Sequence, residues 1–146
     1  MLKQIKIDNS RVHFLGYIPH SEMIKVLLMS TAHVYLTVPF VLSWSMLEAM
    51  ALECLVIGSD TAPVKEIIKH NVNGLLVDFF SPEKIAEQIN KVFKHKDKML
   101  AIRKKARKTI VEKYALKKLL PLHLDLISSI AKGQIPPLTK KIKARD

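Results

Sequence analysis

The chain has 146 residues, 49% of them apolar and 25% charged, which fits one domain with a buried core and excludes a wholly disordered chain. Its single cysteine, Cys54, excludes a disulfide framework and a cysteine-rich zinc site, and its apolar runs are too short to span a membrane. The net charge of +11 favours anionic partners such as nucleic acid, acidic lipid or phosphorylated ligands.

A short apolar run over residues 12–16 is the first predicted element, and we expect it to form a buried strand. A turn over residues 17–19 follows, and Ser21 is suited to cap a helix whose apolar residues recur at helical spacing. Residues 34–36 return to strand character. The chain therefore begins with the order strand, helix, strand.

The same alternation continues along the chain. A loop over residues 38–44 precedes a helix over 45–51, and a short apolar strand follows at 55–58. Ser81 and Pro82 form a clear helix start, because serine is a good cap and proline is tolerated in the first turn. The remaining expected elements are a helical turn at 64–69, a strand at 75–77, helices at 82–93, 97–114 and 116–131, and a basic tail after residue 137.

Short apolar strands that alternate with helices imply parallel pairing through helical crossovers. We therefore predict an α/β fold, with a doubly wound parallel sheet and helices on both faces. One domain would cover residues 1–133, and residues 134–146 would form a flexible basic tail. Ligands of such sheets bind beyond the carboxyl ends of the strands, which favours the loops at 17–21, 37–44 and 59–64 as the site.

Five segments taken in order, VHFLGYIP, SEMIKVLLMSTAHVYL, LEAMALECLVIGSD, KEII and NGLLVDF, resemble the carboxyl-terminal domain of the group 1 (family 4) retaining glycosyltransferases. The resemblance is dense over residues 12–93 and looser to about Ile127. Members of this family have the GT-B fold, in which two Rossmann-like domains face each other across a cleft. The resemblance implies that residues 1–133 are the Rossmann-like nucleotide-sugar-binding half, and that its first strand and the acceptor-binding domain lie outside this chain.

The donor site of the family is marked by two glutamates with seven residues between them, and Glu48 matches the second. By resemblance, the Glu48 carboxylate accepts hydrogen bonds from ribose hydroxyls, although a solvent-exposed or capping role is the plain alternative. The first glutamate falls at Phe40, whose side chain can neither accept a hydrogen bond nor carry charge. This departure implies either a differently built sugar pocket or a loss of donor binding.

The other candidate donor-site residues lie in neighbouring loops, and for each of them a turn, core or domain-packing role stays open. Ser43 and Ser45 precede or begin the helix of Glu48, where hydroxyls and free backbone N–H groups would hold a phosphate. The resemblance places Tyr17 and Ile18 near the nucleotide base, and it places the loop residues Ser59, Asp60 and Thr61 along the cleft near the donor. Trp44, in the loop before Glu48, and Glu66, which follows Lys65 where the family has proline, complete the candidates.

The activity that the resemblance implies is hexosyl transfer from a nucleotide sugar to a glycan, lipid or other acceptor. We expect the isolated half to have weak or no activity, and its catalytic residues stay unknown. No metal or other cofactor is expected, because the six histidines show no ligand spacing with acids or cysteines. The expected partners are the nucleotide sugar, a separate amino-terminal domain, and an acidic membrane surface reached from the cytoplasm.

Two competing hypotheses remain open. A non-enzymatic nucleotide- or partner-binding module derived from such an enzyme would account for Phe40 and for the basic tail. Nucleic-acid binding through the basic runs at 103–108 and 140–145 would account for the charge, but it leaves the order of strands unexplained.

Overall fold

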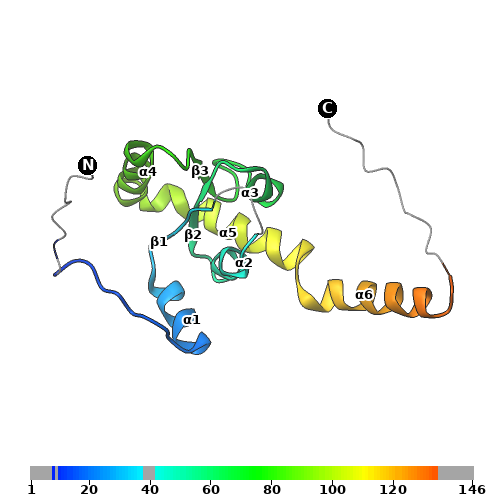
Figure 1. Ribbon diagram of the computed structural model, residues 1–146. Coiled ribbons are helices and arrows are strands. Elements are labelled where there is room, and N and C mark those ends of the chain that lie inside the picture. Colours follow the sequence, from blue (N-terminus) through cyan, green and yellow to red (C-terminus); the bar gives the residue numbers. More distant parts are fainter. Residues whose placement is uncertain (1–7, 9, 38–41, 135–146) are drawn as a thin grey trace.

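The computed structural model describes residue 8, residues 10–37 and residues 42–134. Phe40 and most of the predicted basic tail lie outside these described residues. The elements in chain order are α1 (His20–Met29), β1 (Ala32–Tyr35), α2 (Trp44–Ala51), β2 (Leu55–Ser59), α3 (Ala62–Ile67), β3 (Leu75–Val77), α4 (Pro82–Lys94), α5 (Lys96–Lys113) and α6 (Leu116–Ala131) (Figure 1).

The three strands form one sheet in the order β1-β2-β3, and both pairings are parallel. The register aligns Ala32 with Leu55 and Ile57 with Leu75. Every residue of the central strand β2 is buried. Burial on both faces explains why this strand is an uninterrupted apolar run rather than an alternating one.

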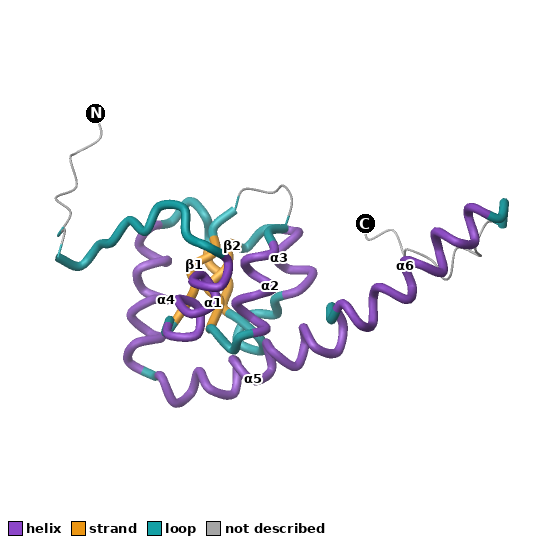
Figure 2. Tube along the Cα trace, turned by 90° about the horizontal axis from the view of Figure 1, so that it is seen from below, coloured by secondary structure: helices purple, strands orange, loops and turns teal. Residues whose placement is uncertain are grey.

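An apolar cluster lies on each face of the sheet. On one face, Val56 and Tyr35 pack with Met46 and Met50 of α2 and with residues of α3. On the other face, Leu55, Ile57 and Leu75 pack with Val92 of α4 and with residues of α5. Figure 2 shows α4 on one side of the strands and α2 and α3 on the other. The predicted doubly wound α/β fold with helices on both faces is confirmed.

Close packing of α3 on the sheet depends on a glycine in β2. A Cβ atom added to Gly58 would lie 2.9 Å from Cγ1 of Val64, which is closer than side-chain atoms approach one another. Gly58 therefore lets α3 lie directly over the strand.

The predicted strand over residues 12–16 is wrong. These residues form no strand in the structure, and all five are exposed, with Phe14 at 86%. A strand needs a hydrogen-bonded neighbour, and in the described part of the chain β1 and β3 pair only with β2. The apolar run signalled burial, but it carried no information about a partner strand.

The start of α1 also differs from the prediction. The helix begins at His20, with Pro19 in the capping position and Ser21 inside the first turn. The carbonyl of Pro19 accepts the backbone N–H groups of Glu22 and Met23, so main-chain geometry sets this helix start without a side-chain cap.

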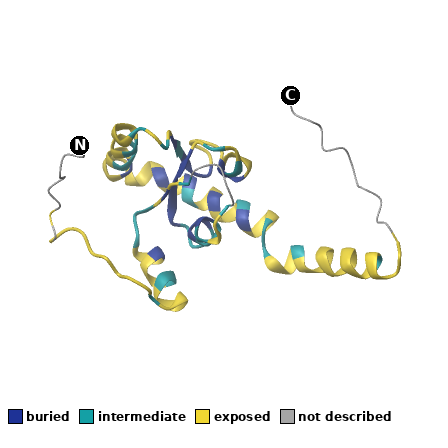
Figure 3. Cartoon of the chain, in the orientation of Figure 1, coloured by how far each residue is buried: buried dark blue, intermediate teal, exposed yellow. Residues whose placement is uncertain are grey.

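The last helix, α6, extends away from the rest of the molecule, as Figures 1 and 3 show. None of its residues is buried. No helix in residues 8–134, as far as these are described, is long and apolar enough to cross a membrane. The exposed leucine and isoleucine side chains of α6 are Leu116, Leu120, Leu122, Leu124, Leu126, Ile127 and Ile130.

We expect the amide hydrogens of α6 to exchange on the order of a thousandfold faster than those of β2. A 16-residue helix without packing partners is marginal in water, and Pro121 removes one hydrogen bond from its interior. Hydrogen exchange followed by mass spectrometry would measure this contrast, with a chain ending at Ala115 as the control for unchanged β2 protection. Protection of α6 equal to that of β2 would contradict the prediction.

Candidate functional site

The carboxyl ends of β1 and β2 are joined by the side chain of Ser59. Its hydroxyl accepts the backbone N–H of Thr37 at 3.2 Å and donates to the carbonyl of Thr37 at 2.8 Å. Ser59 is completely buried. Ser59 is one of the predicted donor-binding residues, and the structure places it beneath the surface of this edge, where it holds the loop that leads toward α2.

The start of α2 is held by a buried tyrosine. The hydroxyl of Tyr35, at the end of β1, accepts the backbone N–H of Ser43 at 2.8 Å. The Ser43 hydroxyl in turn caps α2 by accepting the N–H of Ser45 at 3.2 Å, and the two serine hydroxyls lie 3.0 Å apart. The predicted pair Ser43 and Ser45 is therefore together at a helix amino terminus, where unpaired N–H groups attract anions.

Glu48 lies in the second turn of α2, not at the amino terminus of the helix. Its side chain is 32% exposed, and Oε1 lies 2.8 Å from Nε2 of His20, the first residue of α1. The carboxylate is thus neither buried nor turned into bulk solvent, and its second oxygen has no protein partner among the described residues. His20 was not among the predicted site residues, although it directly follows the turn at residues 17–19.

The remaining polar candidates lie beyond β2. The backbone N–H of Asp60 donates to the carbonyl of Val77 at 2.7 Å, and the Asp60 carboxylate pairs with Lys65 at 2.9 Å. Thr61 is the capping residue of α3, but its hydroxyl makes no capping bond and lies 3.4 Å from that of Ser59. Glu66 is exposed on α3. Asp60 and Thr61 therefore share the strand-end edge with Ser59.

The aromatic candidates are solvent-exposed. Tyr17 is fully exposed and Trp44 is 81% exposed, whereas Ile18 is partly buried. Such aromatic surface suits either a ligand that stacks on it or a neighbouring domain that covers it.

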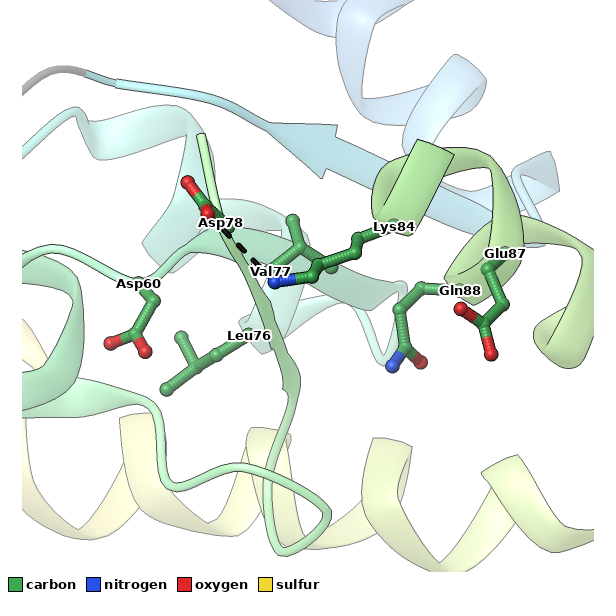
Figure 4. Close-up of a pocket in the computed structure, with 7 residues that line it drawn as sticks. All are labelled: Asp60, Leu76, Val77, Asp78, Lys84, Glu87 and Gln88. Atoms are coloured by element: carbon green, nitrogen blue, oxygen red, sulfur yellow. Dashed lines mark ion pairs between the residues drawn. The ribbon is translucent and has the colours of Figure 1, made fainter. Parts of the chain in front are cut away.

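A cavity of about 500 Å³ lies between β3 and α4, beside the strand-end edge. Figure 4 shows Lys84 extending from α4 toward Asp78, whose carboxylate is 3.9 Å from the ammonium group. Asp60 is the one predicted site residue in its wall. With three carboxylates against one lysine, this cavity suits hydroxyl groups or a cation better than phosphate. Its lining consists of Asp60, Leu76, Val77, Asp78, Lys84, Glu87 and Gln88.

The profile of the group 1 glycosyl transferase family matches residues 4–109. The chain belongs to this family. The resemblance inferred from the sequence is therefore confirmed, and the parallel α/β architecture is the one expected of a carboxyl-terminal domain of this family. No curated protein matches the chain.

Solved glycosyltransferase structures share the fold of this group 1 chain. HepE of Anabaena, crystallised with UDP-glucose, matches at a TM-score of 0.78 and 20% identity, over 83% of this chain and 33% of HepE. Sucrose-phosphate synthase of Thermosynechococcus elongatus matches at 0.78 and 20%, over 86% of this chain and 32% of the synthase. The carboxyl-terminal domain of LpcC, a group 1 protein of Francisella tularensis, matches at 0.59 and 25%, over 70% and 53%. The chain thus spans about a third of the length of the first two.

Two groups in this group 1 domain have a shifted pKa, the partly buried imidazole of His33 and the buried thiol of Cys54. Burial lowers the pKa of His33 in β1, which favours the neutral imidazole. Burial raises the pKa of the Cys54 thiol, against an opposing effect of the Arg103 charge, which favours the protonated form. In the part of the chain that is described, no three histidine, cysteine or acidic residues cluster as metal ligands would.

The basic run at residues 103–108 has a structural role in this group 1 domain. Arg103 donates to the carbonyl of Glu53, and Arg107 donates to the carbonyl of Ala51, both at the carboxyl end of α2. Cations at that end of a helix are stabilised by its dipole. Two of the five basic residues in the run are therefore used to fasten α5 to α2, which weakens the nucleic-acid hypothesis.

Proposed function

We propose that residues 1–133 are the donor-binding half of a retaining hexosyltransferase that takes its sugar from a nucleoside diphosphate. The observation that supports this most directly is the position of Glu48. Its carboxylate lies partly exposed on α2 with one oxygen held by His20 and one oxygen open to a ligand. An ionised carboxylate is a pure acceptor, which suits a ribose that presents two neighbouring hydroxyls.

The diphosphate of the donor would lie at the amino terminus of α2. Free backbone N–H groups at this end, together with the hydroxyls of Ser43 and Ser45, are the donors that phosphate oxygens need. This chain supplies no carboxylate at position 40 for the transferred sugar, so the sugar would take its contacts from other groups or from a second domain.

A second domain would complete the enzyme. In a GT-B enzyme, transfer takes place between two domains, and positioning of acceptor, donor and departing phosphate supplies much of the lowering of the barrier. We propose that this chain is weakly active or inactive alone and acts with an amino-terminal domain that binds the acceptor. We further place it in the cytoplasm, where its basic surface would contact acidic lipid. The structural neighbour HepE, crystallised with UDP-glucose, makes UDP sugars the first donors to test.

Replacing Glu48 with alanine is expected to weaken binding of UDP and UDP-glucose roughly tenfold to a hundredfold, the effect of losing hydrogen bonds to a charged acceptor. Titration of the labelled chain followed by NMR chemical shifts would measure the dissociation constants. Glu112→Ala is the matched control, since Glu112 lies on α5 and its carboxylate is 3.7 Å from the ammonium group of Lys108. Unchanged affinity in Glu48→Ala, with binding in the parent chain, would contradict the proposed function.

A non-enzymatic nucleotide-binding module is the second candidate, because Phe40 replaces the acid that holds the transferred sugar in the family. Both candidates predict that Glu48 binds nucleotide. They separate in a transfer assay with the chain and its amino-terminal partner domain, in which only the enzyme would release UDP in an acceptor-dependent way.

A further inference from the structure

One contact between two distant parts of the chain lies at the proposed ribose site. Nε2 of His20 is 2.8 Å from Oε1 of Glu48, and 28 residues separate the two along the chain. His20 is the first residue of α1 and directly follows the turn that carries Tyr17 and Ile18. The contact therefore ties the loop assigned to the nucleotide base to the helix assigned to the ribose.

We propose that His20 is a positioning residue of the donor site, which orients the carboxylate of Glu48 for the ribose. The inference rests on the proposed role of Glu48. The imidazole N–H donates to Oε1 and fixes the plane of the carboxylate. Oε2, which has no protein partner among the described residues, then stays available as an acceptor for one ribose hydroxyl or a pair of hydroxyls.

Orientation matters here because a glutamate side chain has three rotatable bonds. A partly exposed carboxylate without a partner samples many rotamers, and a ligand that binds one of them must overcome the lost freedom. A hydrogen bond formed before the ligand arrives removes most of that cost. His20 acts through Glu48, and its own ring makes no contact that the proposed site requires.

The same contact contributes little to folding. The side chain of His20 is 64% exposed, and exposed ion pairs add little to stability because water screens them. The helix α1 is held independently, through buried Leu27 and partly buried Met23 in the cluster under α2. Variants of His20 are therefore expected to keep α1 in place and to fold normally.

The experiment compares nucleotide affinity in the full chain with His20 replaced by alanine or by glutamine. His20→Ala is expected to bind UDP roughly fivefold to tenfold more weakly, the usual effect of one hydrogen bond to a charged group at a partly exposed site. His20→Gln is expected to recover most of this loss, because its amide nitrogen reaches about as far as Nε2. His123→Ala, the same change at an exposed position of α6, is the matched control.

The double variant His20→Ala with Glu48→Ala tests whether His20 acts through Glu48. We expect it to bind UDP no more weakly than Glu48→Ala alone. A full further loss in the double variant, an unchanged affinity in His20→Ala, or no recovery in His20→Gln would each overturn the positioning role. If Glu48→Ala itself binds as the parent chain does, the proposed function fails first, and the two failures are thereby distinguished.

Discussion

Replacing Ile57 with alanine is expected to lower the free energy of unfolding by about 3 to 4 kcal/mol, within the range measured for large-to-small changes in cores. Ile57 is completely buried at the middle of β2, and it packs with Leu75, Val92 and Ile102 on the face under α4 and α5. Domains of this size are stable by only about 5 to 15 kcal/mol, so the loss would be a large part of the total. Urea denaturation followed by circular dichroism would measure it.

Val34→Ala is the matched control for Ile57→Ala. Val34 is an aliphatic residue of the neighbouring strand β1, but its side chain is 38% exposed. Its replacement removes less buried surface, so we expect a loss of about 1 kcal/mol or less. Equal losses in the two variants would show that the core does not lie where the structure places it.

Replacing Ser59 with alanine is expected to lower the free energy of unfolding by about 1 to 3 kcal/mol. The change removes both hydrogen bonds between the buried hydroxyl and the backbone of Thr37. The loop between β1 and α2 would then lose its attachment to β2, and nucleotide affinity should fall together with stability. Thermal denaturation and NMR titration with UDP on the same variant would measure the two effects.

Ser128→Ala makes the same chemical change at an exposed position of α6 and is expected to alter stability by less than about 0.5 kcal/mol. A Ser59→Ala variant that loses affinity but keeps its stability would show that the hydroxyl contacts the ligand rather than holding the loop.

Much of the fold could be predicted because local pattern and tertiary structure agree in most of the chain. The strand at residues 55–58 is apolar throughout because a central parallel strand is covered on both faces. The helix after Ser81 starts as predicted, since the Ser81 hydroxyl accepts the N–H of Lys84 and Pro82 occupies the first turn. In both places a few neighbouring residues determine the structure.

The errors occurred where composition does not report what lies beside a segment in the folded chain. The run at residues 12–16 has strand composition, yet it has no hydrogen-bonded neighbour in the described structure. Ser21 has the chemistry of a cap, but the carbonyl of Pro19 begins the helix first. Composition indicates what a segment is suited to, whereas pairing and caps are decided by what lies beside it.

The edge of the sheet that carries the candidate residues could be predicted from the sequence, but the hydrogen bonds between them could not. The carboxyl ends of parallel strands meet at one edge, so Ser43, Ser59 and Asp60 were expected near one another. The pair of His20 and Glu48 needs the packing of α1 on α2, and no short-range signal reports that packing. The burial of Ser59 could not be predicted, because its hydroxyl bonds to the backbone of Thr37 and the sequence does not show which backbone groups come together.

The central position of β2 affects how the sheet unfolds. Within the described residues, β1 and β3 each pair with β2 and with no other strand. If β2 unfolds, neither β1 nor β3 keeps a hydrogen-bonded neighbour in the sheet. The hydrogen bonds of β1 to β2 and of β2 to β3 would then break together, because both sets involve β2. Departure of β2 therefore breaks both strand pairings of the described sheet, and no population keeps two strands paired while the middle one is free.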